Sequence, residues 1–178
     1  MSRPQHILIC GERGVGKSTL VNKLLLQSRR PVFGFITKKM PPNQNGECDV
    51  YIHPANSANL QLTHENLVGI CNNGKIVTIN TEVFNTVGVK LLQSPPRGLL
   101  LMDELGFMES KASAFCSGVL AVLDGDIPVL AAVKNKETPF LKAVREHKNV
   151  ELHYITTQNR DMLYQELIEK IMEYNQWK

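Results

Sequence analysis

Apolar residues along the chain follow two patterns: short continuous runs, and longer stretches in which they recur every three or four positions. A short continuous run is typical of a strand buried on both faces of a parallel sheet, and the wider spacing is typical of an amphipathic helix. The runs predict strands at about residues 6–10, 99–102, 128–133 and 151–155. The spaced stretches predict helices at about residues 17–27, 81–92, 112–123, 138–147 and 159–172. Because strands and helices alternate at both ends of the chain, we predict an α/β fold with a mostly parallel central sheet and flanking helices.

The segment after the first predicted helix has a different pattern. Residues 32–37 are rich in β-branched and aromatic residues, and a polar turn separates them from a strand-like run at 47–53. A second pair of runs, at 67–71 and 75–79, is joined by two asparagines and a glycine. Strand-like runs joined by polar turns predict antiparallel hairpins. We therefore expect two hairpins inserted after the first helix.

Two helix starts carry local signals. Thr81 is predicted as the N-cap of the second helix, because threonine is a favoured capping residue. Thr138 followed by Pro139 predicts an N-cap with proline at the first helical position.

Composition indicates the number of domains and the classes of partner to expect. The 178 residues are 43% hydrophobic and 21% charged, which is ordinary for a globular protein and predicts one domain spanning residues 1–178. The net charge of +3 is small, and no cluster of Lys and Arg or long apolar run is present, so we expect neither a nucleic-acid nor a membrane partner. The sequence identifies no protein partner, and we expect a monomer. Reduced thiols in a cytoplasmic protein are predicted from the four widely separated cysteines, Cys10, Cys48, Cys71 and Cys116.

Candidate chemistry begins with residues 11–18, which fit the pattern G-x-x-x-x-G-K-[ST] between a predicted strand and a predicted helix. In such a P-loop the glycines let the backbone curl so that its N–H groups surround an anion, and the helix N-terminus adds a favourable dipole. Lys17 is placed to reach the β- and γ-phosphates, and the Ser18 hydroxyl to bind Mg²⁺. The motif therefore predicts a nucleoside phosphate site. Its predicted binding residues are Gly11, Glu12, Arg13, Gly14, Val15, Gly16, Lys17, Ser18 and Thr19.

A second constellation follows the apolar run at 99–102. Asp103 is predicted to assist Ser18 in holding Mg²⁺, because P-loop enzymes use an acid at the end of a second strand. Glu104, the next residue, is predicted to orient a water and accept its proton during in-line attack on the γ-phosphate. The pair favours hydrolysis, with water as the acceptor.

Residues 103–109, Asp-Glu-Leu-Gly-Phe-Met-Glu, resemble the D-E-[IL]-G-x-M-E signature of the broad-specificity P-loop nucleoside-triphosphatases. The resemblance covers nearly the whole chain, including residues 34–37, the helix at 83–92, Phe115 and residues 157–160. It implies Mg²⁺-dependent hydrolysis of nucleoside triphosphates to diphosphate and phosphate, with poor base discrimination and slow turnover. It also implies a fold related to nucleotide kinases and RecA-like ATPases.

This chain departs from the family signature at Phe107, where many members have a lysine. If that lysine neutralises charge in the transition state, this protein either uses another cation or is slower. The candidate cations are Arg13, Arg97 and Arg160, of which Arg97 is better interpreted as a solvated surface arginine. Arg13 lies inside the P-loop, facing either the phosphates or solvent. Arg160 is predicted either to contact the nucleotide near its base or to cap the last helix.

Three alternatives bear on the substrate and the reaction. Asn135-Lys136 resembles the start of the guanine-specific N-K-x-D motif, but Thr138 stands where the aspartate belongs, so we expect weak base selectivity. A nucleotide or small-metabolite kinase is an alternative, although residues 34–89 contain no arginine to hold a monophosphate acceptor. A nucleotide-dependent switch or accessory protein with slow hydrolysis is the other.

Overall fold

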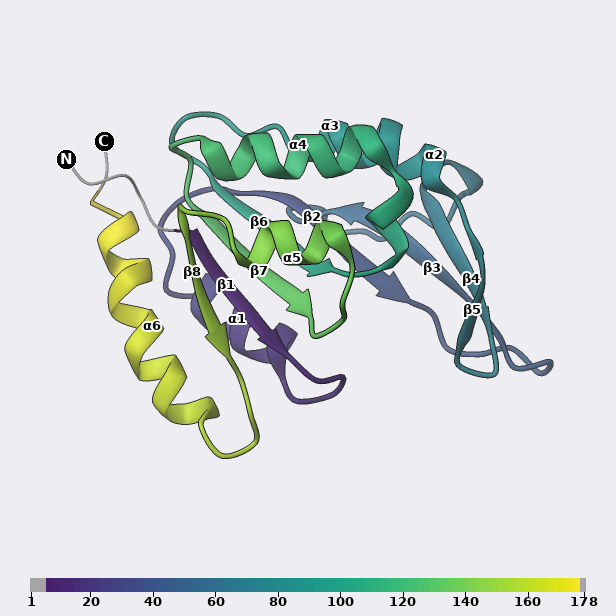
Figure 1. Cartoon of the computed structure of the whole chain (residues 1–178), viewed down its shortest axis with the longest axis horizontal. Coiled ribbons are helices and arrows are strands. Elements are labelled where there is room, and N and C mark those ends of the chain that lie inside the picture. The colour runs from purple at the N-terminus through teal and green to yellow at the C-terminus, as the bar shows by residue number, and fades with distance from the viewer. Residues whose placement is uncertain (1–5, 177–178) are drawn as a thin grey trace.

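The computed structural model describes residues 6–176, and in this part of the chain eight strands form one sheet with the order β5-β4-β3-β2-β6-β7-β1-β8 (Figure 1). Strands β2, β6, β7, β1 and β8 are parallel to one another, whereas β3, β4 and β5 extend the sheet in antiparallel pairing. The predicted α/β fold is confirmed, and both predicted hairpins belong to the central sheet. The strands are β1 (His6–Gly11), β2 (Val32–Lys39), β3 (Glu47–Pro54), β4 (Leu67–Asn72), β5 (Lys75–Ile79), β6 (Leu99–Leu105), β7 (Val129–Lys134) and β8 (Val150–Tyr154).

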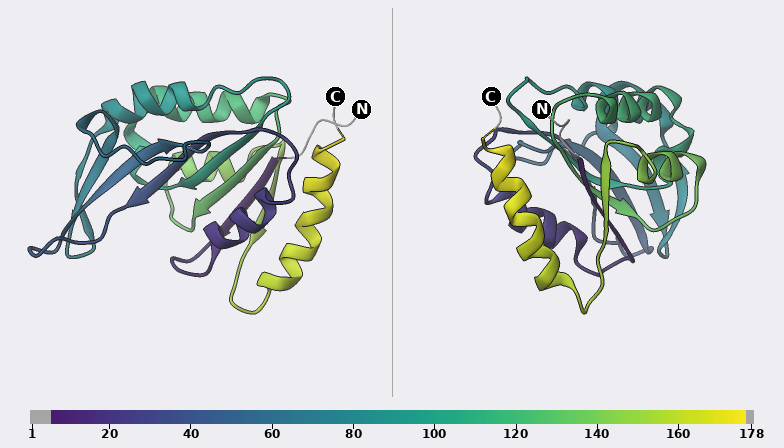
Figure 2. Two further views of the ribbon diagram at one scale, coloured as in Figure 1. Left: turned by 180° about the vertical axis from the view of Figure 1, so that it is seen from behind. Right: turned by 60° about the vertical axis from the view of Figure 1, so that its left-hand side comes forward.

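Helices cover both faces of the parallel part of the sheet (Figures 1 and 2). Helices α1 and α6 pack on one face, and α2, α3, α4 and α5 pack on the other. The helices are α1 (Lys17–Leu25), α2 (Thr81–Val83), α3 (Val89–Leu91), α4 (Ser113–Asp124), α5 (Pro139–Arg145) and α6 (Arg160–Tyr174), with a π-helical segment η2 (Phe84–Gly88) and 3-10 helices η1 (His64–Asn66) and η3 (Met108–Lys111). None of the helices among the described residues is both long enough and apolar enough to cross a bilayer.

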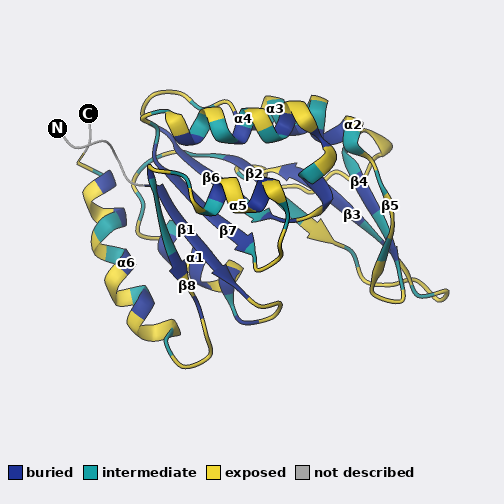
Figure 3. Ribbon diagram, in the orientation of Figure 1, coloured by how far each residue is buried: buried dark blue, intermediate teal, exposed yellow. Residues whose placement is uncertain are grey.

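Strand β1 shows why continuous apolar runs predicted the central strands. Ile7 and Ile9 join the core that contains α1 and α6, while Leu8 joins the core under α4 and α5. Successive side chains of a strand point to opposite faces, so a strand covered on both sides needs apolar residues at every position. All six residues of β1 are buried, and the central strands are the darkest elements in Figure 3.

The second predicted helix differs from the expectation. Asn80, not Thr81, occupies the N-cap position, and the helix widens into the π-helical segment η2 between α2 and α3. The widened turn presents Asn85, whose side-chain oxygen accepts the backbone N–H groups of Ala114 and Phe115 in the first turn of α4. A residue distant in sequence thus satisfies the N-terminus of α4, where the N-cap residue Ala112 has no side-chain acceptor.

The other predicted helix start is confirmed. The Thr138 hydroxyl accepts the Leu141 N–H at 3.1 Å, and Pro139 is the first residue of α5. Helix α5 ends at Arg145, two residues before the predicted end.

The strand order determines where functional side chains can meet. Because β7 lies between β1 and β6 and all three are parallel, their carboxyl ends lie side by side. In open α/β sheets, ligands bind at this carboxyl edge. The predicted P-loop follows β1 at this edge, and Asp103 and Glu104 lie in the last three residues of β6.

Candidate active site

The predicted P-loop connects β1 to α1 in a tight turn. Gly16 immediately precedes α1 with φ 107°, a left-handed conformation that strains any residue with a side chain. Its neighbour Lys17 begins the helix, so the first N–H groups of α1 face the space enclosed by the loop. An N-terminus of this kind favours an anion.

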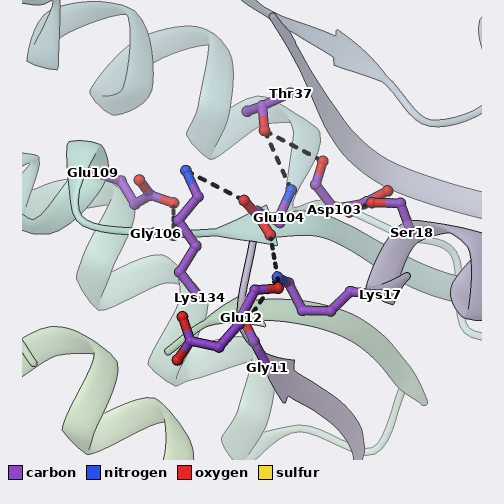
Figure 4. Close-up of polar contacts among 10 residues, drawn as sticks. All are labelled: Gly11, Glu12, Lys17, Ser18, Thr37, Asp103, Glu104, Gly106, Glu109 and Lys134. Atoms are coloured by element: carbon purple, nitrogen blue, oxygen red, sulfur yellow. Dashed lines mark hydrogen bonds and ion pairs between the residues drawn. The ribbon is translucent and has the colours of Figure 1, made fainter. Parts of the chain in front are cut away.

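The Lys17 side chain is only 6% exposed and lies within the loop. Its Nζ donates hydrogen bonds to the carbonyl oxygens of Gly11 at 2.9 Å and Glu12 at 3.0 Å. It also forms an ion pair with Glu104 Oε2 at 3.3 Å. The predicted phosphate-binding cation and the predicted general base are therefore in contact across the site (Figure 4).

The two predicted metal ligands are also in contact. The Ser18 hydroxyl donates to Asp103 Oδ1 at 2.9 Å, joining the start of α1 to the end of β6. Burial raises the pKa of Asp103, whereas the hydrogen bond from Ser18 and the charge of Lys17 lower it. A hydroxyl and a carboxylate supply the hard oxygen atoms that Mg²⁺ prefers.

The backbone at Asp103 and Glu104 departs from regular strand geometry. The peptide bond that joins them is cis, and the β6–β7 register shifts between Asp103 and Leu105. The Glu104 N–H donates to the Thr37 hydroxyl at 3.2 Å, and that hydroxyl donates in turn to the Asp103 carbonyl oxygen at 3.4 Å. Thr37 on β2 therefore supports both residues from the neighbouring strand (Figure 4).

Glu104 lies between two lysines. Lys17 contacts its Oε2, and Lys134 at the end of β7 contacts its Oε1 at 3.2 Å. The Glu104 carboxylate is 22% exposed, so water can reach it. A carboxylate held on both sides and open to water is suited to orient an attacking water.

These groups line a cavity of about 330 Å³ at the carboxyl edge of the sheet. A second cavity of about 140 Å³ shares Gly16 and Thr19 with it and lies between α1 and the start of α6. The first cavity is lined by Arg13, Gly14, Gly16, Lys17, Ser18, Thr19, Thr37, Asp103 and Glu104. The second is lined by Gly16, Thr19, Leu20, Lys23, Thr157, Gln158, Arg160, Asp161 and Tyr164.

The three candidate arginines occupy different places. Arg13 is exposed and lines the first cavity. Arg160 is the first residue of α6 and lines the second cavity beside Gly16. Arg97 precedes β6, at the opposite end of the strand from Asp103, where its charge lowers the pKa of Arg30 in addition to the effect of burial. Arg97 is exposed at the other edge of the sheet and lines neither cavity, which agrees with its interpretation as a solvated surface arginine.

Sequence reasoning did not assign a role to Lys134, Thr37 or Glu109. Lys134 is a charged residue directly after a buried apolar run, the same signal that identified Asp103 and Glu104. Its neighbour Asn135, considered for guanine recognition, donates to the Glu12 carboxylate at 2.8 Å and so contacts the P-loop. Glu109 is 3% exposed and accepts the Gly106 N–H at 2.6 Å.

A family model described as NTPase matches residues 6–168. The chain belongs to the NTPase family. This match confirms the resemblance to the P-loop nucleoside-triphosphatases that the sequence motifs indicated. The family signature accounts for Glu109 as the last residue of its acidic motif, and here that residue bonds the backbone of the same motif.

The similarity to three relatives in this family extends over almost the full length of the chain. Nucleoside-triphosphatase THEP1 of Methanocaldococcus jannaschii is 30% identical over 176 residues, covering 94% of this chain and 97% of the relative. Nucleoside-triphosphatase THEP1 of Thermotoga maritima is 28% identical, covering 95% and 96%. The cancer-related nucleoside-triphosphatase homolog of Bos taurus is 27% identical, covering 92% and 95%. The crystal structure of THEP1 from Aquifex aeolicus matches with a TM-score of 0.66 at 23% identity, over 97% of this chain and 99% of that chain, which shows the same fold.

Proposed function

We propose that this protein hydrolyses nucleoside 5'-triphosphates to the diphosphate and phosphate, using Mg²⁺ and discriminating weakly between bases. The observation that carries the proposal is the convergence of Ser18 with Asp103 and of Lys17 with Glu104 at one cavity. A phosphate-binding cation, an oxygen pair suited to a metal and a carboxylate open to water are the parts that hydrolysis of a phosphoric anhydride needs. Family membership and the names of the relatives support the same reaction.

The nucleotide would lie across the two adjoining cavities. In this proposal the P-loop N–H groups and Lys17 hold the β- and γ-phosphates over the first cavity. Arg13, exposed at its rim, would stabilise charge on the γ-phosphate. The nucleoside would extend over the second cavity, beside Arg160 and Tyr164. Weak base selectivity is expected because Thr138, which would take the aspartate position of a guanine motif, instead caps α5.

The donor set fits Mg²⁺. The Ser18 hydroxyl and Asp103 carboxylate lie 2.9 Å apart at the rim of the cavity, and both are hard oxygen donors. When bound there, the metal would neutralise charge on the phosphates. The second acid, Glu104, contacts the two lysines and not the Ser18–Asp103 pair, so in this proposal it is the proton acceptor and not a metal ligand.

The reaction follows from these positions. Glu104 would accept a hydrogen bond from a water in line with the bond between the γ-phosphorus and its bridging oxygen. As the water oxygen bonds to phosphorus, its proton passes to the Glu104 carboxylate, and the nucleoside diphosphate leaves with the bridging oxygen. Lys17 would stabilise the negative charge on the phosphates throughout the reaction.

The test measures phosphate release from ATP, GTP, CTP and UTP by the Glu104→Gln variant. Nucleotide affinity is measured in a separate experiment, by the fluorescence of a labelled analogue. We expect kcat to fall by about 10² or more, the scale for losing a general base, while Mg²⁺-nucleotide binding is retained. Glu82→Gln is the matched control, because Glu82 is exposed on α2. Unchanged turnover in Glu104→Gln would mean that another group positions the water.

The same assay separates the alternatives. Phosphate release without any added acceptor supports the hydrolase, whereas transfer that requires an acceptor identifies a kinase. A switch would capture a partner with a non-hydrolysable analogue and not with the diphosphate. The monomeric state and cytoplasmic location stay predictions, testable by light scattering and by fractionation of cells.

A further inference from the structure

We infer that Lys134 is a positioning residue of the hydrolytic site, which holds Glu104 by its Oε1 atom so that Oε2 faces the attacking water. The inference rests on the proposed role of Glu104 as the general base. Lys134 Nζ forms an ion pair with Glu104 Oε1 at 3.2 Å, while the other carboxylate oxygen pairs with Lys17 Nζ at 3.3 Å. Figure 4 shows the two ammonium groups on either side of the carboxylate.

The sheet places Lys134 at the centre of the site. It is the last residue of β7, the strand between the P-loop strand β1 and the acidic strand β6. In the register of β1 with β7, Lys134 pairs with Gly11, the first glycine of the P-loop. A long cationic side chain at this point can reach Glu104 directly.

Contacts along the side chain restrict where Lys134 can point. Its Cδ atom passes so near Gly106 that a Cβ atom on residue 106 would lie 3.0 Å away. Its ammonium group lies over the ring of Phe107, 5.5 Å from the centroid, which is within cation–π range. Half-exposed Lys134 is thus steered toward Glu104 by the backbone and ring that follow Glu104 in sequence.

Lys134 is needed beside Glu104 because Lys17 also binds the phosphates in the proposed reaction. When a triphosphate enters the P-loop, its negative charge competes with Glu104 for Lys17, and it also repels the Glu104 carboxylate. Lys134 remains on the far oxygen, where it offsets this repulsion and keeps the carboxylate aimed at the water. Its removal should therefore slow the chemical step and leave nucleotide affinity almost unchanged.

The experiment compares Lys134→Met, Lys134→Arg and the control Lys136→Met by steady-state phosphate release. Methionine keeps the length of the side chain without its charge, and arginine keeps the charge. Lys136 is an exposed lysine two residues further on, so its variant makes the same charge change outside the site. We expect Lys134→Met to lower kcat by about 10-fold or more with KM changed less than about 3-fold, and Lys134→Arg to retain most of the rate.

A double variant tests whether Lys134 acts through Glu104. Residues that act as one unit are non-additive, so Lys134→Met should lower kcat no further in the Glu104→Gln background. A further loss of the same size in that background would overturn the inference. A rise in KM with unchanged kcat would also overturn it, because Lys134 would then only bind nucleotide.

Two further comparisons complete the test. Phe107→Leu removes the ring beneath the ammonium at an exposed position, and we expect a smaller fall in kcat. An unchanged kcat in this variant would count against the inference even if Lys134→Met did not fold. If Glu104→Gln slows turnover and Lys134→Met does not, only the inference about Lys134 fails. If Glu104→Gln itself leaves turnover unchanged, the proposed role of Glu104 fails instead.

Discussion

Glu109 is a buried carboxyl group whose ionisation should make the protein less stable as pH rises. Burial raises its pKa from 4.5 to about 7, although the N–H of Gly106 and the charge of Lys134 oppose the shift. The charge of Glu104 raises it further, and the Cys116 thiol on α4 donates to the Glu109 carbonyl oxygen. Glu109→Gln removes the titration and keeps an oxygen for the Gly106 N–H.

Proton linkage gives the direction and the size of the change in the free energy of unfolding with pH. Because the folded state holds its proton more tightly than the unfolded state, the free energy of unfolding falls as pH rises from about 4.5 to about 7. A shift of this size corresponds to about 3 kcal/mol, since one pKa unit is about 1.36 kcal/mol. Relative to wild type, Glu109→Gln should therefore gain about 2–3 kcal/mol of stability between pH 5 and pH 8. In a chain of this length that difference is on the order of 10 °C in Tm.

The assay is urea unfolding followed by circular dichroism at pH 5, 6, 7 and 8, on wild type and Glu109→Gln. Other titrating groups affect both proteins equally, and any packing change caused by the amide is independent of pH, so the difference between the curves isolates Glu109. Glu82→Gln, at an exposed position, should give a flat difference. A flat difference for Glu109→Gln would refute the reasoning, because it would mean that Glu109 ionises alike in the folded and unfolded states.

Three further predictions, the last with a matched control, test the loop and the sheet. Lys17→Ala should abolish triphosphate binding or turnover, measured with a fluorescent nucleotide and by phosphate release; near-normal activity would remove the P-loop assignment. Arg13→Ala should lower kcat by about 10³ if its guanidinium faces the γ-phosphate, and an unaltered kcat would reject that role. Gly34→Ala should prevent stable folding, because the added Cβ would lie 1.9 Å from the Leu101 carbonyl oxygen. Gly74→Ala, at φ +83° with no atom within 4 Å of the added Cβ, should cost only about 1 kcal/mol in urea unfolding.

The sequence was sufficient for features whose geometry is local. The P-loop could be recognised because a strand, a glycine-rich turn and a helix start are consecutive, and their backbone conformations follow from the residues themselves. The cap at Thr138 was predictable for the same reason. The widened turn in the second helix was not, since Asn85 there serves the N-terminus of α4 about thirty residues later.

Pairing Asp103 with Ser18 required more than local pattern, and it succeeded because a buried parallel strand ending in acids places those acids at the carboxyl edge of the sheet. The same argument was open for Lys134. The contact of Lys134 with Glu104 depends on which strands are neighbours, and the apolar runs of β1, β6 and β7 look alike in the sequence. The distance of Arg97 from this edge likewise depends on the direction of β6 in the folded sheet.

The sequence by itself therefore determined the glycine-rich loop between β1 and α1, the acidic pair and the α/β class, because each depends on residues adjacent in the chain or on the period of burial. Only the tertiary structure decided what surrounds Glu104. Its contacts come from α1, β2 and β7, and their distances depend on the order of strands in one sheet. Strand order is a property of the whole packed chain, set by which faces the helices cover, and no short window of sequence contains it.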